Sequence, residues 1–423
     1  SDEGKSMRHM FFAERGVAKI PDIPKETKTQ NINKAAIIGS GTMGGGIAMN
    51  FANVGIPAVV VDINEDALKI GLDRVKNNYS SSVAKGRMSQ EKMDQTMNLI
   101  SGATNYSEIS DCDIVIEAVF ENMDLKKEIF SKLDLIAKDS AILATNTSAL
   151  NINEIAETTK RPESVIGLHF FSPANVMRLL EIVRGEKTSK QIIATSMGLA
   201  KAIGKTAALV GVCPGFVGNR ILAQRQREAN KLILEGALPW EIDDALFDFG
   251  FPMGPFAMSD LAGLDIGWDK ETSRSETIRD ILCENGRFGQ KSGKGFYIYD
   301  ENRNKLPDND VEKIIQEFAD NKQIKRREIE KDEILKRCLY PMINEGFKIL
   351  DEGMAIRASD IDIIWINGYG WPIYEGGPMF YGNLIGYDKI LSWLQDMEKE
   401  YGSDFSPSPY LEKVVEEKIN IFN

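Results

Sequence analysis

The sequence predicts an α/β domain with a doubly wound, parallel sheet, followed by an all-α region of two duplicated helical modules. Three observations support this fold class. Short apolar runs alternate with amphipathic helical segments from about residue 34 to residue 210. Helical spacing then replaces the strand pattern, and one ordered set of short motifs occurs twice. Continuous apolar strands that alternate with helices are typical of a parallel sheet covered on both faces.

The first expected strands are short apolar runs bounded by turn residues, and helical spacing fills the gaps, as in residues 125–135. These runs are residues 35–38, 58–61, 114–116 and 141–144. Before them, residues 7–15 are expected to form a short helix with Phe11 and Phe12 on its apolar side, and residues 16–32 a linker. The predicted boundaries are therefore residues 1–32 for the entry helix and linker, 33–210 for the α/β domain, 211–303 for the first helical module and 304–423 for the second.

The helical region contains an internal repeat. Each copy has, in the same order, a Glu-Gly pair, an Ile-Asp pair, a Gly-aromatic-Pro turn, a Gly-Pro turn and a Leu-x-Gly-x-Asp segment. The copies begin at Glu235 and Glu352 and end at Asp265 and Asp388. Agreement of this many ordered elements indicates that one helical module was duplicated.

Composition excludes several classes of function. The formal net charge of −12 argues against nucleic acid as the main partner, because phosphate binding requires a basic surface. No run of about 18 apolar residues occurs, so no membrane span is expected. The four cysteines lie far apart without a CxxC spacing, and there are only two histidines, which argues against a metal site or a disulfide framework.

Gly39-Ser40-Gly41-Thr42-Met43-Gly44 is a GxGxxG motif directly after the first expected strand and before a helix. In this setting Gly39 permits a tight turn, Gly41 lets the backbone approach a pyrophosphate, and Gly44 packs helix against strand. The helix N-terminus, with Thr42 and Met43, offers free N–H groups to the phosphates. Asp62 ends the second strand, where its carboxylate would accept hydrogen bonds from the adenosine ribose and repel a 2′-phosphate. These features predict a Rossmann-type domain that binds NAD; a glycine-rich turn without a ligand is the alternative.

His169 and Glu181 are the candidates for acid–base chemistry. His169 lies near the end of an expected strand, and ligands of doubly wound sheets bind at the carboxyl ends of strands, so it is expected to face the nicotinamide. Glu181 is the lone carboxylate in the apolar run 178–183, and a buried carboxylate requires a partner. A pair between them would raise the basicity of the outward ring nitrogen, as a general base requires. A structural histidine with satisfied hydrogen bonds is the alternative.

Several motifs resemble those of the L-3-hydroxyacyl-CoA dehydrogenase family. They are Glu117-Ala118-Val119-Phe120-Glu121-Asn122, Thr145-Asn146-Thr147-Ser148, His169-Phe170-Phe171-Ser172-Pro173, Pro214-Gly215-Phe216-Val217-Gly218-Asn219-Arg220 and the segment 286–295. Gly368-Tyr369-Gly370-Trp371-Pro372, in the second module, looks like the corresponding segment of peroxisomal multifunctional enzymes of type 1. The resemblance extends over nearly the whole chain, from about residue 11 to residue 410.

The resemblance implies roles for individual residues. His169 matches the family's catalytic base and Glu181 its carboxylate partner. Ser148 and Asn219 match polar residues that hold the reacting oxygens of the substrate. Monofunctional members usually have Asn where this chain has Ser172, whereas the multifunctional enzymes resemble this chain in having Ser, so the role of Ser172 stays open.

Three further residues, Glu121, Lys126 and Asn146, match positions near the nicotinamide half of the cofactor. The residues by themselves leave other readings open. Ser148 could cap a helix that begins near residue 151, and Asn219 could be a helix-start residue. Glu121 and Lys126 could form the solvated first turn of a helix.

Cations are frequent in the helical stretch after the second strand. In the family the CoA nucleotide lies over such a segment, so these residues are candidates for phosphate contacts, although a charge run is also typical of a solvated face. They are Lys69, Arg74, Lys76, Lys85, Arg87 and Lys92. The acyl chain is expected to lie between the two domains.

The segment 7–15 resembles the helix that follows the enoyl-CoA hydratase/isomerase half of the multifunctional enzymes. No such half precedes it here, so we expect a fragment or a truncated version of a longer enzyme, whose other half would generate the substrate. Monofunctional relatives dimerise through one helical module. Because a second copy in the same chain can cover the same surface, a monomer is expected.

The resemblance therefore implies an oxidoreductase of fatty-acid β-oxidation that converts (S)-3-hydroxyacyl-CoA and NAD to 3-ketoacyl-CoA and NADH. A dehydrogenase of free 3-hydroxy acids and a non-catalytic NAD-binding scaffold are the alternatives. The family comparison favours the peroxisomal matrix, but the chain ends in Ile421-Phe422-Asn423 and not in Ser-Lys-Leu, so a bacterial cytoplasm is the alternative.

Overall fold

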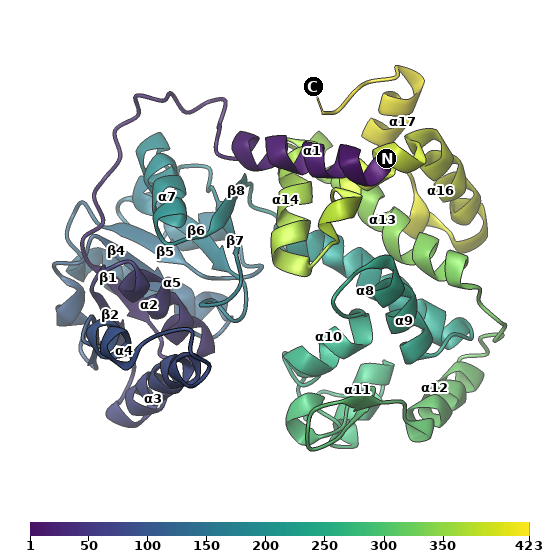
Figure 1. Cartoon of the computed structure of the whole chain (residues 1–423), viewed down its shortest axis with the longest axis horizontal. Coiled ribbons are helices and arrows are strands. Elements are labelled where there is room, and N and C mark those ends of the chain that lie inside the picture. The colour runs from purple at the N-terminus through teal and green to yellow at the C-terminus, as the bar shows by residue number, and fades with distance from the viewer. Residues whose placement is uncertain (423) are drawn as a thin grey trace. The chain divides into compact units, whose positions relative to one another are not determined.

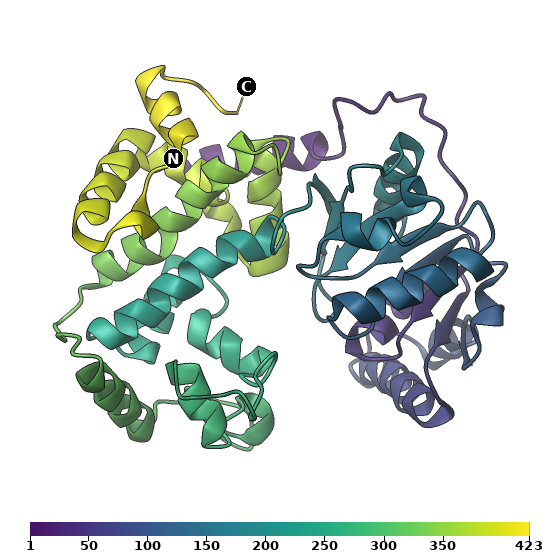
Figure 2. The same ribbon diagram turned by 180° about the vertical axis from the view of Figure 1, so that it is seen from behind.

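Two structural units make up the chain in the computed structural model, which describes residues 1–422 (Figures 1 and 2). The first unit combines Ser1–Arg220 with Lys348–Tyr369 and the described residues from Asn420 onward. The second unit combines Ile221–Phe347 with Gly370–Ile419. Asn423, the last residue of the C-terminal tripeptide considered above, lies outside the described residues.

An eight-stranded sheet forms the core of the first unit. Its strand order is β3-β2-β1-β4-β5-β6-β7-β8. The strands are β1 (Ala35–Ile38), β2 (Ala58–Val61), β3 (Ile100–Ala103), β4 (Ile114–Glu117), β5 (Ile142–Thr145), β6 (Val165–Phe170), β7 (Leu179–Val183) and β8 (Thr206–Val210). With the helical region that follows, this sheet confirms the predicted fold class. The strands β3 and β8 were not predicted.

One strand pair departs from the predicted parallel sheet. Strands β6 and β7 run antiparallel, while every other strand pair in this sheet is parallel. The physical reason is the short connection of residues 171–178, because a parallel pair requires a crossover of a dozen or more residues. In this antiparallel register His169 lies directly opposite Glu181.

Helices cover both faces of the sheet. The chain passes from β1 to β2 through α2 (Thr42–Asn53) in one direction along the sheet, and from β4 to β5 through α5 (Met123–Ile136) in the other. Because such crossovers are right-handed, the two helices lie on opposite faces, and the strand order reverses between β1 and β4 (Figures 1 and 2). Ligands of doubly wound sheets bind at this reversal point, outside the carboxyl ends of the strands. The other helices of this domain are α3 (Glu65–Ala84), α4 (Gln90–Met97), α6 (Ile152–Ala156) and α7 (Lys190–Ala202).

The N-terminal helix α1 (Asp2–Gly16) is longer than predicted and presents a different face. It packs against α14 (Ala358–Tyr369), which belongs to the same unit (Figure 1). Met10 of α1 is buried, whereas Phe11 and Phe12 are 51% and 63% exposed. The prediction that Phe11 and Phe12 form the packing side was wrong, because the buried positions of a helix follow its 3.6-residue period rather than the largest side chains.

The helical region repeats its elements. Helix α10 (Pro255–Ala262) has a glycine N-cap, a proline in its first turn and a terminating glycine, Gly263, with φ of 106°. Helix α15 (Pro378–Ile385) has the same features and ends at Gly386, with φ of 104°. The remaining elements are α8 (Gly218–Glu235), α9 (Pro239–Phe249), α11 (Ile278–Glu284), β9 (Ile298–Tyr299), β10 (Lys305–Leu306), α12 (Asn309–Asn321), α13 (Lys331–Asp351), α16 (Tyr387–Tyr401) and α17 (Pro409–Glu416).

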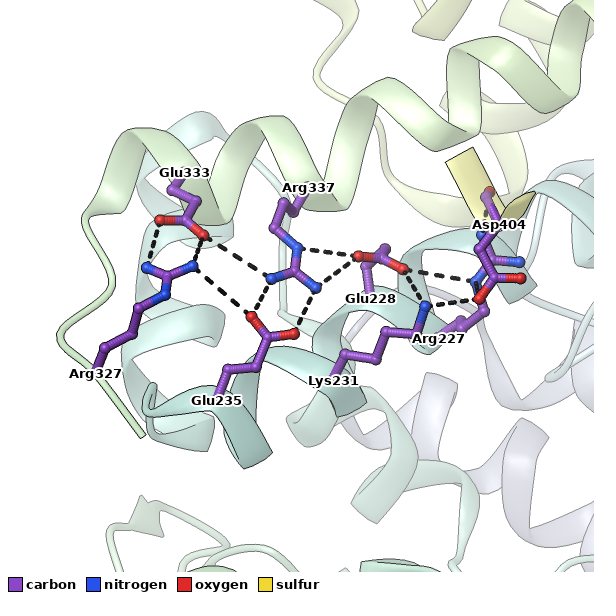
Figure 3. Close-up of polar contacts among 8 residues, drawn as sticks. All are labelled: Arg227, Glu228, Lys231, Glu235, Arg327, Glu333, Arg337 and Asp404. Atoms are coloured by element: carbon purple, nitrogen blue, oxygen red, sulfur yellow. Dashed lines mark hydrogen bonds and ion pairs between the residues drawn. The ribbon is translucent and has the colours of Figure 1, made fainter. Parts of the chain in front are cut away.

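A buried arginine joins α8 and α13 in the second unit (Figure 3). Arg337 is fully buried and donates to both Glu228, at 3.0 Å, and Glu235, at 2.9 Å. Lys231 links Glu228, at 3.3 Å, to Asp404, at 2.7 Å. The network therefore supplies the counter-charges that a buried guanidinium requires.

None of the helices formed by residues 1–422 combines the length and the apolar character that crossing a membrane requires.

Candidate active site

The glycine motif forms a turn at the carboxyl end of β1. Gly39 has φ of +100°, and a Cβ there would lie 2.8 Å from the carbonyl oxygen of Ala118. A Cβ on Gly44 would lie 1.8 Å from the carbonyl oxygen of Gly39, so helix and turn touch at this point. A Cβ on Gly41 would meet nothing within 4 Å, which leaves open space beside the backbone.

This turn fits the pyrophosphate of a dinucleotide. Helix α2 begins at Thr42, followed by Met43, and its N-cap Gly41 supplies no side-chain hydrogen bond to the first turn. The N–H groups of that turn can therefore bind an anion, which the partial positive charge of the helix end also favours. The open space at Gly41 is where the backbone approaches the phosphates in such sites.

Asp62 follows β2 and faces the glycine turn. Its Oδ2 accepts hydrogen bonds from the Ser40 backbone N–H at 2.7 Å and from the Ser40 hydroxyl at 2.5 Å. Ser40 thus orients the carboxylate that is expected to bind the ribose, and Ser40 itself was not predicted to have such a role. Helix α3 can approach Ser40 because Gly71 has no side chain; a Cβ there would lie 2.3 Å from the Ser40 carbonyl oxygen.

A buried charge cluster lies at the carboxyl ends of β4 and β5. Lys126, only 1% exposed, donates to Oε1 of the fully buried Glu117 at 2.7 Å and lies 3.4 Å from Oε2 of Glu121. Thr145 donates to the other oxygen of Glu117 at 2.7 Å. The reading of Lys126 as a solvated residue was therefore wrong. Glu117 was missed, although a carboxylate at the end of an apolar strand is the same signal that identified Glu181.

The carboxylate of Glu121 accepts hydrogen bonds from the loop after β5. Its Oε1 accepts from the Thr147 hydroxyl at 2.5 Å, the Ser148 backbone N–H at 2.8 Å and the Ser148 hydroxyl at 3.2 Å. Burial raises the pKa of Glu121, but these hydrogen bonds and the Lys126 charge outweigh it, and the pKa lies below its ordinary value. Ser148 does not cap the following helix, because Asn151 is the N-cap of α6 and its own side chain accepts from Asn153.

Asn146 ties the end of β5 to the end of β6. Its side-chain Oδ1 accepts from the backbone N–H of Phe170 at 2.9 Å, and its backbone N–H donates to the Glu117 carbonyl oxygen at 2.7 Å. Phe170 follows His169 in β6. Asn146 therefore holds the strand that carries His169 in place.

The structure brings His169 and Glu181 together. His169 Nδ1 lies 2.7 Å from Glu181 Oε2, and both side chains are buried. An ionised carboxylate can only accept, so Nδ1 carries the proton and Nε2 keeps its lone pair. The second oxygen of Glu181 accepts from the Gly218 backbone N–H at 2.8 Å. This leaves Nε2 as the ring nitrogen that can take a proton.

The first turn of α8 lies beside this pair. Asn219 follows Gly218 at the start of the helix, and its side-chain Oδ1 accepts from the Tyr369 hydroxyl at 2.8 Å. Asn219 is thus a helix-start residue whose side-chain oxygen is engaged by a second side chain.

The remaining candidates lie at the surface. Ser172 is exposed, and of the cations proposed for CoA only Arg74 is partly buried. Lys69 is 77% exposed and pairs with Asp73 at 2.6 Å, one turn along the same helix. Their exposure is typical of a solvated helix face, and their role in CoA binding remains a prediction.

The fold and the site together define a class, the NAD-dependent dehydrogenases with a Rossmann-type domain and a helical C-terminal region. The family model described as "3-hydroxyacyl-CoA dehydrogenase, NAD binding domain" matches residues 34–213. The model described as "3-hydroxyacyl-CoA dehydrogenase, C-terminal domain" matches residues 215–299 and again residues 334–420. The chain belongs to the 3-hydroxyacyl-CoA dehydrogenase family.

Relatives from animals and plants match almost the whole chain. The human peroxisomal bifunctional enzyme is 40% identical over 98% of this chain, which covers 61% of that protein. The peroxisomal fatty acid β-oxidation multifunctional protein MFP2 of Arabidopsis thaliana is 39% identical over 97% of this chain, which covers 58% of that protein. The chain thus spans about three-fifths of the length of these relatives.

Solved structures share the architecture. The dehydrogenase part of multifunctional enzyme 1 from C. elegans is 33% identical, with a TM-score of 0.71 and coverage of 96% of each chain. The 3-hydroxybutyryl-CoA dehydrogenase of Escherichia coli K12 is 27% identical, with a TM-score of 0.78 and coverage of 91% of this chain and 98% of that one. These likenesses agree with the family assignment.

Proposed function

We propose that this chain oxidises the 3-hydroxyl group of (S)-3-hydroxyacyl-CoA to a ketone, with His169 as the general base. The observation that carries the proposal is the 2.7 Å contact between His169 Nδ1 and Glu181 Oε2. His169 lies near the carboxyl end of β6, and the glycine turn follows the carboxyl end of β1. Because the strands between them are parallel, these ends meet at one edge of the sheet, where ligands of this fold bind.

In this reaction the chain's own residues are proposed to transfer the hydroxyl proton. NAD, when bound, accepts the hydride that leaves the carbon of the alcohol. His169 Nε2 removes the hydroxyl proton, so that the O–H bond breaks as the C=O bond forms. The buried carboxylate of Glu181 stabilises the imidazolium that results and keeps the ring in one tautomer.

Two polar residues are proposed to hold the reacting oxygens of the substrate. Ser148 carries a hydroxyl in the loop after β5, where Glu121 fixes its backbone; to donate to a substrate, this hydroxyl turns away from the Glu121 oxygen that accepts from it at 3.2 Å. Asn219 carries an amide at the start of α8, beside the Gly218 N–H that binds Glu181. Donors of this kind stabilise negative charge on a carbonyl oxygen as it becomes an alkoxide in the reverse reaction.

Glu121, Lys126 and Asn146 are proposed to surround the nicotinamide half of NAD. Lys126 is held by Glu117 and Glu121, so its position is fixed before the cofactor binds. Asp62, oriented by Ser40, is proposed to bind the adenosine ribose. A carboxylate at this position repels the 2′-phosphate of NADP and favours NAD.

Relatives longer than this chain suggest its wider context. We propose that the whole protein is a multifunctional β-oxidation enzyme in which an enoyl-CoA hydratase half supplies the 3-hydroxyacyl-CoA, and that it works in the peroxisomal matrix. The names of the human and Arabidopsis relatives and their greater length support both statements. A second helical module in the same chain supports a monomer, since the second C-terminal match covers residues 334–420.

One assay tests the proposed reaction and its cofactor. The oxidation of NADH is followed with acetoacetyl-CoA and with free acetoacetate, and then again with NADPH. We expect turnover of the CoA ester with NADH and much slower rates with the free acid or with NADPH. Turnover of the free acid alone would refute the acyl-CoA assignment, and failure to bind NADH would refute the proposal as a whole.

A further inference from the structure

Tyr369, the last residue of α14, lies against the proposed active site although it belongs to the second helical module. Helix α14 packs on strands β7 and β8 of the same unit. The approach is close at Gly368, where a Cβ would lie 2.4 Å from Cδ2 of Leu179 in β7. The strand that carries Glu181 therefore also supports the end of α14.

The Tyr369 hydroxyl fixes one orientation of the Asn219 side chain. It donates to Asn219 Oδ1 at 2.8 Å, so the carbonyl end of the amide faces Tyr369. Because the amide is planar, its NH₂ end must point the other way. A carbonyl or alkoxide oxygen of a substrate needs a donor, and this orientation presents one.

Aromatic packing holds the Tyr369 ring. The ring stacks on Trp365, with centroids 4.5 Å apart, and meets Phe171 edge-on at 5.4 Å. Phe171 in turn lies 4.4 Å from the His169 ring. A ring held on two sides keeps its hydroxyl in one place and loses little entropy in making the hydrogen bond.

The backbone at Gly218, next to Asn219, lies in close contact with the same hydroxyl. A Cβ on Gly218 would lie 2.5 Å from the Tyr369 hydroxyl oxygen, so no larger residue fits there. The Gly218 N–H binds Glu181, which binds His169. Contacts thus run in a closed ring from His169 through Glu181, Gly218, Asn219, Tyr369 and Phe171 back to His169.

We propose that Tyr369 is a positioning residue of the dehydrogenase site, which aims the Asn219 amide at the reacting oxygen of the substrate. This inference rests on the proposed function. In the first module the corresponding residue is Phe249, since Phe249-Gly250-Phe251-Pro252 aligns with Tyr369-Gly370-Trp371-Pro372. Phenylalanine keeps the ring and lacks the hydroxyl. The duplicated module therefore supplies a hydroxyl that its first copy does not have.

The test is the kinetics of Tyr369→Phe with acetoacetyl-CoA and NADH. We expect kcat/KM for acetoacetyl-CoA to fall by about tenfold, the effect of losing one hydrogen bond to a substrate-facing group. The KM for NADH is expected to stay unchanged. In an Asn219→Ala background, which alone should cost about 100-fold, Tyr369→Phe is expected to have no further effect, because its hydrogen-bond partner is gone.

Tyr79→Phe is the matched control, because the Tyr79 hydroxyl donates to Asn53 Oδ1 at 2.9 Å, away from the proposed site. We expect it to keep wild-type kinetics even if its melting temperature falls. Wild-type kinetics in Tyr369→Phe, or equal losses in both Asn219 backgrounds, would overturn the role of Tyr369. Either result would leave the proposed function standing, provided that the wild type turns over acetoacetyl-CoA and His169→Ala does not. Absence of turnover by the wild type would instead refute the proposed function.

Discussion

Arg220 forms with Glu352 the same ion pair that Arg337 forms with Glu235. In both pairs the guanidinium binds the carboxylate through two nitrogens, and the Nη2–Oε1 distances are 2.8 Å in the first pair and 2.9 Å in the second. Glu235 and Glu352 begin the two copies of the repeat, and each arginine lies at the same distance in sequence before the glutamate of its own copy. The arginine of each copy therefore pairs with the glutamate of the other copy. Reciprocal contacts of this kind are typical of the interface of a two-fold symmetric dimer.

The first prediction concerns the buried member of this set. Arg337→Met should lower the free energy of unfolding of the second unit by about 3 kcal/mol, because it removes the buried guanidinium that the fully buried Glu228 and the partly buried Glu235 share. Denaturant unfolding measures the change. The adjacent Lys336→Met is the control, since Lys336 pairs with the exposed Asp332, and about 0.5 kcal/mol or less is expected there. Equal effects of the two substitutions would contradict the account.

A second prediction compares two lysines of α5. Lys126→Met should lower the free energy of unfolding by about 3 kcal/mol and weaken NADH binding, because the buried Glu117 loses the cation that neutralises it. Lys132, on the same helix, pairs with Glu128 at the surface, where both side chains are more than half exposed. Lys132→Met should therefore leave the free energy of unfolding nearly unchanged. Thermal or denaturant unfolding of both variants decides whether burial sets the difference.

The third prediction concerns pH. Because the pKa of Glu121 in the folded protein lies below its ordinary value of 4.5, its ionised form stabilises the fold above that value, and this contribution is lost as the pH falls through the folded pKa. The wild type should exceed Glu121→Gln in free energy of unfolding at neutral pH, and the difference should shrink below pH 4.5. Urea unfolding over this range measures it. A difference that does not vary with pH would show that ionisation of Glu121 is unimportant.

Much of the architecture could be predicted from the sequence because its signals are local. The strand β1, the glycine turn and helix α2 follow one another within a few residues, and each has its own pattern. Glu181 could be singled out as a charge in an apolar strand, and a buried charge needs a partner. Missed elements had weaker patterns: β3 contains a serine and a glycine, and two of its four residues are exposed.

The parts that could not be predicted depend on contacts distant in sequence. Nothing in the helical pattern around Lys126 distinguishes it from a surface lysine, and its contact with Glu117 is formed only in the folded chain. Tyr369 lies 150 positions from Asn219, and nothing in the sequence near either residue indicates their hydrogen bond. The face that α1 buries was also mispredicted, because it depends on α14, more than 300 residues away.

The rate of acetoacetyl-CoA reduction by His169→Ala tests the central claim most directly. The account predicts a loss in kcat of about 10²- to 10⁴-fold, because the variant lacks the imidazole whose Nε2 exchanges a proton with the substrate oxygen. NADH binding, measured by fluorescence, should be unchanged, since none of the residues proposed to hold the cofactor is altered. A variant that turns over at the wild-type rate would contradict the assignment of His169 as the acid–base residue.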